Sequence, residues 1–128
     1  MKVRKALLNL LPQELRSVRI SEEVLEGHYG NEIRVFNVEL RGDEAFKALK
    51  HIICSLSQSD RNALLLSLAL RLGDVKSHLH LRLDKQEAYL GTITLRDGSD
   101  IIKFSVTIDG CRKLDDVKNF LDELIREC

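Results

Sequence analysis

The stretch Val75-Lys-Ser-His-Leu-His-Leu-Arg-Leu83 alternates apolar and polar side chains and runs directly into Asp84-Lys-Gln86. Successive side chains of a β-strand point to opposite faces of the sheet, so this alternation predicts a half-buried strand. Ser77 is the one exception on the apolar side. The other face would carry an unbroken polar row of Lys76, His78, His80 and Arg82.

Two stretches downstream continue the same alternation. Leu90–Arg96 and Ile101–Ile108 are separated by the tight turn Asp97-Gly-Ser-Asp100, which predicts an antiparallel hairpin beside the first strand. The polar side chains that would extend the polar face are Thr92, Thr94, Arg96, Lys103, Ser105 and Thr107. One face of the sheet would then be apolar, and the other polar and locally cationic.

Upstream of this stretch, helical and alternating patterns follow one another. Pro12 would end an opening helix. Two strands would follow, Val18–Glu26 and Ile33–Arg41, joined by the turn Gly27-His-Tyr-Gly-Asn31. The later predicted elements are a helix from an Asp43 N-cap to Leu56, a break at Ser57–Asp60, a helix Arg61–Leu72 closed by Gly73, and an amphipathic helix Leu114–Ile125.

This order of elements predicts an α+β fold of two layers, with a mainly antiparallel sheet and the helices packed on one of its faces. A length of 128 residues suits a single domain over residues 1–128. Because Trp is absent and aromatic residues make up only 5% of the chain, the core must consist mainly of Leu, Ile and Val.

Overall charge does not favour any class of partner. The chain has 20 basic and 20 acidic residues, which excludes a protein held on nucleic acid by net charge alone. Between Arg61 and Arg96, however, six basic residues outnumber three acidic ones. Nucleic-acid binding would therefore depend on local clustering of cations.

The cysteines and the apolar runs bear on the cellular location. Cys54, Cys111 and Cys128 form no CxxC pair, and we interpret them as reduced thiols of a cytoplasmic protein, not as a disulfide framework or a zinc knuckle. The longest apolar run, Ala63–Leu72, is far shorter than the roughly 20 residues that span a bilayer. No signal peptide and no membrane partner are expected.

A cationic face rich in hydroxyl groups suits a phosphate backbone, because each bound Lys or Arg releases condensed counterions. An ordinary solvated sheet face would explain the same pattern. Modules that bind single strands stack bases on aromatic side chains, and this face has none. Contact with backbone and shape is therefore expected instead of base recognition.

Enzymatic chemistry has weaker support. His78 and His80 share a strand face, but a zinc site needs at least one more protein ligand, and the sequence offers only scattered candidates. Asp84 beside Lys85, and His28 in its glycine turn, lack a nucleophile–base constellation. We therefore predict no catalytic residue, no metal site and no cofactor, and keep a metal-dependent enzyme as a third hypothesis.

The segment His80-Leu-Arg-Leu-Asp-Lys-Gln-Glu-Ala-Tyr-Leu-Gly91, with Glu26-Gly-His-Tyr-Gly-Asn31 upstream, resembles an archaeal family of RNA-binding proteins and predicted exosome subunits. The resemblance covers nearly the whole chain, and the group is similar in fold to a large-subunit ribosomal protein of the α/β two-layer type. It implies a non-catalytic accessory protein that contacts structured or ribosomal-type RNA, with an RNA-processing complex such as the exosome as a partner.

The resemblance also implies which residues take part. Arg82 would grip phosphate bidentately, Lys85 would meet it as a point charge, and Gln86 would bond to a base edge or a 2′-hydroxyl. Together with the polar strand face predicted from the alternation, the family markers complete the set of expected RNA contacts. This set is Lys76, His78, His80, Arg82, Lys85, Gln86, His28 and Asn31. Gly27, Gly30 and Asp84 are assigned to turn structure.

One departure from the family pattern concerns the start of the chain. The family pattern begins with a strand before the first helix, whereas this chain starts at that helix. Either the natural protein starts upstream, or the sheet lacks an N-terminal edge strand and exposes unpaired backbone groups. An open edge of this kind would favour a homodimer. The alternative function is accordingly a protein–protein assembly module that acts through the apolar 61–72 helix or an open sheet edge.

Overall fold

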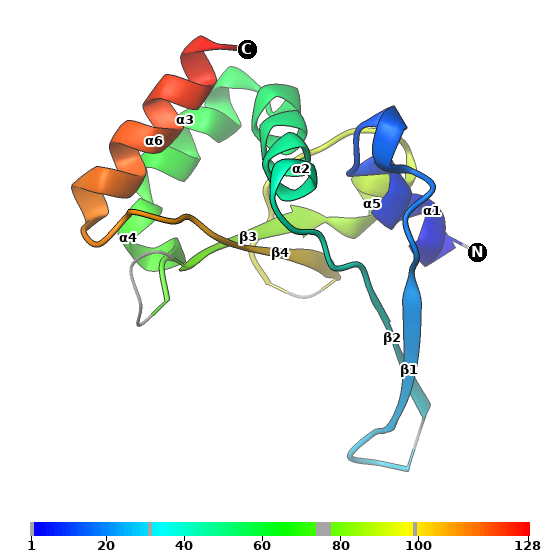
Figure 1. Ribbon diagram of the computed structural model, residues 1–128. Coiled ribbons are helices and arrows are strands. Elements are labelled where there is room, and N and C mark those ends of the chain that lie inside the picture. Colours follow the sequence, from blue (N-terminus) through cyan, green and yellow to red (C-terminus); the bar gives the residue numbers. More distant parts are fainter. Residues whose placement is uncertain (1, 31, 74–77, 99) are drawn as a thin grey trace.

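The computed structural model describes residues 2–30, 32–73, 78–98 and 100–128 (Figure 1). The elements in chain order are α1 (Lys2–Asn9), the 3-10 turn η1 (Gln13–Leu15), β1 (Ser21–Glu26), β2 (Glu32–Asn37), α2 (Asp43–Ser55), α3 (Gln58–Leu66), α4 (Leu68–Arg71), β3 (His78–Asp84), α5 (Lys85–Tyr89), β4 (Ile101–Thr107) and α6 (Leu114–Arg126). Helices and antiparallel strands in this arrangement confirm the α+β class.

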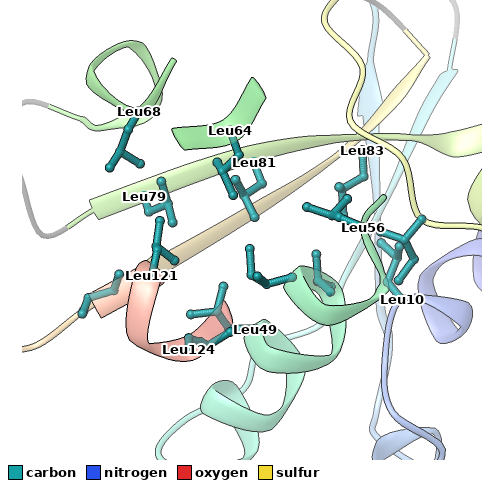
Figure 2. Packing of buried hydrophobic residues seen from close by; sticks show 14 of the residues in the cluster. Leu10, Leu49, Leu56, Leu64, Leu68, Leu79, Leu81, Leu83, Leu121 and Leu124 are labelled. Atoms are coloured by element: carbon teal, nitrogen blue, oxygen red, sulfur yellow. The ribbon is translucent and has the colours of Figure 1, made fainter. Parts of the chain in front are cut away.

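Strand β3 forms one side of the core. It pairs antiparallel with β4, and its Leu79, Leu81 and Leu83 are fully buried. Figure 2 shows these leucines in one cluster with leucines of α2, α3 and α6, among them Leu49 and Leu121. The predicted alternation of β3 is therefore confirmed over the described residues from His78 onward, and it directs the apolar face toward the helices.

The strands do not form the single sheet that was expected. β1 pairs only with β2, and β3 only with β4 among the described strands. The β1–β2 hairpin projects from the body as an arm, and every residue of β1 is exposed (Figure 1). An apolar cleft of about 400 Å³ lies between the two pairs and is lined by residues of α1, β2 and β4, including Leu7, Phe36 and Phe104.

The predicted strand Leu90–Arg96 is wrong, and so is its hairpin with Ile101–Ile108. The Asp84 carboxylate accepts the Glu87 backbone N–H at 2.9 Å and caps a short helix, α5, directly after β3. The Asn9 amide then donates to the last carbonyls of α5, including that of Ala88. Within the predicted strand, Leu95 forms an isolated β-bridge with Leu83, at the edge of β3 opposite β4.

Three helix boundaries also differ from prediction. The expected break between two helices exists, but it covers Leu56 and Ser57 and not Ser57–Asp60, because the Ser57 hydroxyl accepts the Asp60 backbone N–H at 3.1 Å and caps α3 from Gln58 onward. The following helix is interrupted at Ser67, so that α4 is a separate turn. Asp43 is the first residue of α2, and Gly42, with φ of 60°, takes the N-cap position in its place.

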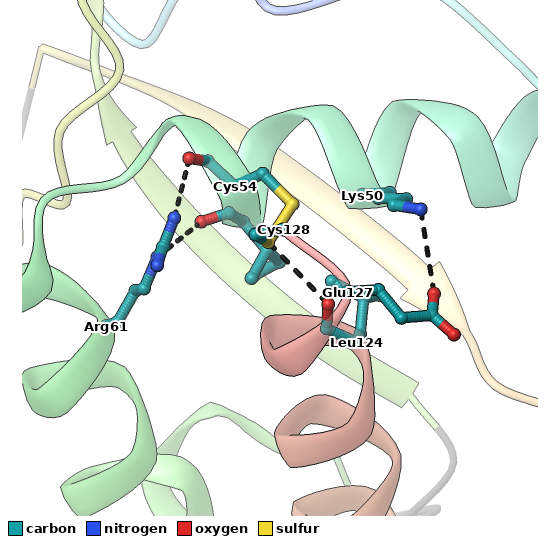
Figure 3. The surroundings of a disulfide bond; sticks show 7 residues. Lys50, Cys54, Arg61, Leu124, Glu127 and Cys128 are labelled. Carbon is teal, nitrogen blue, oxygen red and sulfur yellow. Dashed lines mark hydrogen bonds and ion pairs between the residues drawn. A yellow bond between two sulfur atoms is a disulfide. The ribbon is translucent and has the colours of Figure 1, made fainter.

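The interpretation of all three cysteines as reduced thiols is contradicted. Cys54, at the end of α2, and Cys128, after α6, form a disulfide across 74 residues of sequence, while Cys111 is free (Figure 3). The Arg61 guanidinium, from α3, donates to the carbonyls of Ile53 and Cys54 at 3.1 and 2.7 Å. A cation on these carbonyls satisfies the C-terminal end of α2, which is where the disulfide is attached.

We expect reduction of this disulfide to destabilise the protein. A cross-link that closes a long loop typically contributes about 2–4 kcal/mol, chiefly by restricting the unfolded chain. Denaturant unfolding with and without dithiothreitol measures the difference, and Cys111→Ser serves as the control that leaves the bond intact. Alkylation of the unreduced, denatured protein should modify one thiol. Modification of three would contradict the disulfide.

Candidate nucleic-acid interface

The outer face of β3 and β4 is the polar face, which we define as His78, His80, Arg82, Lys103, Ser105 and Thr107. The antiparallel register places His78 opposite Thr107, His80 opposite Ser105, and Arg82 opposite Lys103. Five of these six side chains are exposed, and His80 is half buried. The alternation in the sequence predicts these six residues on one face. The strand that it predicts beside Ile101–Ile108, namely Leu90–Arg96, is the part that is wrong.

Arg82 and Lys103 form a like-charge pair directly across the two strands. Like charges in opposed positions destabilise a sheet. No carboxylate of the described residues lies within ion-pair distance of either side chain. Two cations therefore lie side by side on an exposed surface, without an ion-pair partner among the described residues.

His80 lies next to this pair and is held in place. Its Nδ1 atom shares a hydrogen bond of 2.9 Å with the Ser105 hydroxyl. A Cβ atom at Gly73 would come within 3.2 Å of its Nε2 atom, so glycine leaves the ring its space. Partial burial, followed by the charges of Lys103 and His78, lowers the pKa of His80 from its ordinary value. The neutral imidazole is thus favoured while no anion is present.

A groove of about 290 Å³ runs along the polar face. Its lining comes from α4, β3, β4 and the loop after Arg96, and consists of Ser67, Leu70, Arg71, His80, Arg82, Asp97 and Lys103. Arg71 and Asp97 were not among the residues expected from the sequence. No local pattern marks them, because α4 and the loop meet β3 only through the tertiary fold.

The end of β3 is a network of ion pairs. The Arg96 guanidinium lies 3.0 Å from the Asp84 carboxylate. The hydrogen bond from the Glu87 N–H has the larger effect and the one from Arg96 the smaller, and together they lower the pKa of Asp84 from its ordinary value. Lys85 pairs with Asp100 at 2.8 Å, and the Gln86 amide donates to the same carboxylate at 3.0 Å. Lys85 and Gln86, both expected to contact RNA, thus hold the loop that ends at Asp100.

The glycine turn lies apart from the polar face, at the tip of the β1–β2 arm (Figure 1). Gly30, with φ of 77°, closes the turn by donating its N–H to the Gly27 carbonyl. His28 is exposed and packs edge-on against Tyr29, whose side chain is 92% exposed. Asn31 and Lys76, which were also expected to contact RNA, fall outside the described residues.

Two further kinds of feature are absent among the described residues, a cluster of metal ligands and a membrane-spanning helix. They contain no group of three or more His, Cys, Asp or Glu side chains that is arranged to hold a metal ion. None of the helices formed by residues 2–30, 32–73, 78–98 and 100–128 is long and apolar enough to cross a membrane.

Comparison with known proteins gives a family match over most of the chain. A family model described as RNA binding matches residues 1–108, a range that includes β3 and β4. The uncharacterized protein MJ0213 of Methanocaldococcus jannaschii is 38% identical over 104 residues, which are 80% of this chain and 70% of that protein. RNA-binding protein PAB1135 of Pyrococcus abyssi is 32% identical over 110 residues, covering 84% of this chain and 71% of that one.

Solved structures show the same fold. The crystal structure of protein AF2318 from Archaeglobus fulgidus matches with a TM-score of 0.79 at 32% identity, covering 96% of this chain and 86% of that chain. Protein SSO0741 from Sulfolobus solfataricus also reaches a TM-score of 0.79, at 20% identity, with 98% and 87% covered. The identity to the second protein is low, so that likeness concerns the fold alone.

In addition to the larger effect of burial, we expect the charge of Lys103 to lower the pKa of His80. Replacing Lys103 by Met removes a neighbouring positive charge, so the pKa of His80 should rise toward the ordinary value of about 6.5 while the effect of burial persists. A pH titration of the imidazole NMR resonances measures the shift. Lys118→Met, on the exposed side of α6, is the matched control. An unchanged His80 titration in Lys103→Met would contradict this account of the polar face.

Proposed function

The chain belongs to the RNA-binding family whose model it matches, and from this premise we propose that the polar face of β3 and β4 holds the phosphate backbone of structured or ribosomal-type RNA. The protein acts as a non-catalytic accessory factor beside an RNA-processing complex such as the exosome. The name RNA-binding protein, carried by the relative from Pyrococcus abyssi, supports the choice of RNA as the partner.

The observation that carries this proposal is the opposed pair of Arg82 and Lys103. Two neighbouring cations that have no ion-pair partner among the described residues cost free energy in the unbound protein, and a polyanion placed over them recovers it. Side chains two positions apart on a strand lie about 6.8 Å from each other, so the row from His78 to Arg82 extends along a backbone and is not limited to a single phosphate.

Backbone and shape are the features that such a face would recognise. It carries no Phe, Tyr or Trp among its described residues, and base stacking is the main route to binding unpaired bases. The hydroxyl groups of Ser105 and Thr107 and the imidazoles of His78 and His80 suit phosphate and 2′-hydroxyl groups. Catalysis is not proposed. The Ser105 hydroxyl lies 2.9 Å from His80 Nδ1, but no side chain of the described residues hydrogen-bonds to the other ring nitrogen to orient the imidazole as a general base.

The remaining expected contacts take secondary places in the proposal. Lys85 and Gln86 position the 97–100 loop through Asp100 and border the RNA path. The arm carries Glu23, Glu26 and Glu32 along its strands, and these charges oppose a phosphate backbone. Glu26 and Glu32 form the last pair before the turn, so this acidic charge lies beside the tip that carries His28, and the tip is left out of the proposed RNA path.

We expect RNA binding that weakens steeply with salt and depends on the opposed cations. Arg82→Ala with Lys103→Ala should lower the affinity for structured RNA tenfold or more and reduce the salt slope by about one unit for each contact removed. Fluorescence anisotropy across a salt series measures both quantities. Lys118→Ala with Arg126→Ala removes the same charge from α6 and should leave binding unchanged. Salt-independent binding, or none, would contradict the proposed function.

A second candidate is the assembly module, which exposed leucines favour. Leu66 at the end of α3 and Leu70 on α4, four positions apart across the interruption at Ser67, are 90% and 88% exposed. Apolar side chains this accessible are a common feature of protein interfaces. Among the described strands, β2 and β4 each have one edge that pairs with no other strand, and both strands line the apolar cleft. A strand of another chain could pair with either edge.

Light scattering tests the assembly module. If copies of the chain associate through the two leucines, the protein should be larger than 14.6 kDa in solution, and Leu66→Glu with Leu70→Glu should restore the monomer mass. Leu90→Glu, at another exposed leucine, is the matched control. A wild-type protein that scatters as a monomer at all concentrations would remove self-association from consideration.

A further inference from the structure

Arg71 stands out among the side chains of the groove because its side chain is mostly buried while its guanidinium is only loosely paired with a carboxylate. Its side chain is 12% exposed. The Nε atom donates to the Ser67 hydroxyl at 2.8 Å, and the ion-pair partner among the described residues, Asp97, lies 3.9 Å from Nη1. That separation is too long for a hydrogen bond. A guanidinium has five N–H donors, and the described residues accept a hydrogen bond from one of them.

We propose that the groove binds one phosphate group, at a position that we call the seat and define as Arg71, His80, Arg82 and Lys103. In the free protein, the Asp97 carboxylate occupies the place of this phosphate. Binding of the phosphate displaces Asp97 and gives the Arg71 guanidinium two close oxygen acceptors. This inference rests on the proposed function for the source of the phosphate, an RNA backbone, but the seat recognises the phosphate group itself.

The seat is built from three separate parts of the fold. Arg71 comes from α4, His80 and Arg82 from β3, and Lys103 from β4. The Ser67 hydroxyl donates to the Ala63 carbonyl at 2.6 Å while it accepts from Arg71, so the guanidinium is fixed before any ligand arrives. Fixing the donors in advance reduces the entropy that a bound anion would otherwise cost.

The chain is anchored both before and after Asp97. On one side, Arg96 donates its N–H to the Arg82 carbonyl at 3.0 Å and pairs with Asp84. On the other side, Asp100 is held by Lys85 and Gln86. Asp97 directly follows the first anchor, so its carboxylate stays near Arg71 although nothing binds it tightly.

Phosphate has two advantages over Asp97 at this position. First, a phosphodiester offers Arg71 a bidentate, charge-assisted pair, whereas the carboxylate stands at 3.9 Å. Second, phosphate can also meet the charges of Arg82 and Lys103, with which Asp97 makes no ion pair. Release of Asp97 costs little, because its side chain is already 82% exposed and hydrated.

Asp97→Asn is the variant that tests the seat. Removing the competing carboxylate should raise the affinity for inorganic phosphate and for structured RNA about threefold to tenfold, whereas Arg71→Lys should lower both by a similar factor. Glu123→Gln makes the same change of charge as Asp97→Asn on an exposed face of α6 and should change neither. The His80 imidazole lines the groove, so its NMR resonances report phosphate binding, and anisotropy reports RNA binding.

The two readouts separate this inference from the proposed function. If phosphate shifts the His80 resonances more strongly in Asp97→Asn but RNA does not bind, the seat stands and RNA binding fails. If RNA binds the wild type while Asp97→Asn and Glu123→Gln are indistinguishable, the seat is overturned and RNA binding stands. Asp97 is exposed, so this variant should keep the wild-type unfolding midpoint and remain informative even if Arg71→Lys does not fold.

Discussion

The Asp84 carboxylate connects the core, the loop and the polar face more directly than any other single group. One oxygen accepts the Glu87 N–H and ends β3 by starting α5; the other holds the Arg96 guanidinium at 3.0 Å. Arg96 is thereby fixed against the edge of β3, and the next residue, Asp97, is carried to the groove. Because the carboxylate is almost buried, its loss would leave the Arg96 charge and an α5 amide without their partner.

The core determines which side chains face solvent. Leu79, Leu81 and Leu83 are fully buried, and a slip of one residue would exchange them for His80 and Arg82. The direction of the polar face is therefore set by the strong preference of three leucines for the interior, and not by interactions among the polar residues. Such a framework can carry the unfavourable opposition of Arg82 and Lys103, which a weakly specified strand would relieve by shifting its register.

The sequence was sufficient for what depends on local pattern and insufficient for what depends on tertiary contact. Alternation identified the two faces of β3, and helical spacing identified α6. The predicted strand at Leu90–Arg96 is wrong because the N-cap at Asp84 starts a helix, and this cap outweighs a short alternation. The local sequence around Asp84 indicates only a turn. The Cys54–Cys128 disulfide and the approach of Arg71 to Asp97 join residues distant in sequence, for which neither composition nor spacing carries a signal.

A neutral protein can present a cationic surface because electrostatic interactions in water act over short distances. At physiological ionic strength the Debye length is about 8 Å, so acidic side chains elsewhere on the surface do little to offset Arg82 and Lys103. What matters is the charge within the groove, where Asp97 is the carboxylate among its lining residues. That carboxylate is loosely held and well hydrated, and it keeps the Arg71 guanidinium partly neutralised while no anion is bound. The balance of charge over the whole chain therefore says less about its partner than the position of this one acidic residue.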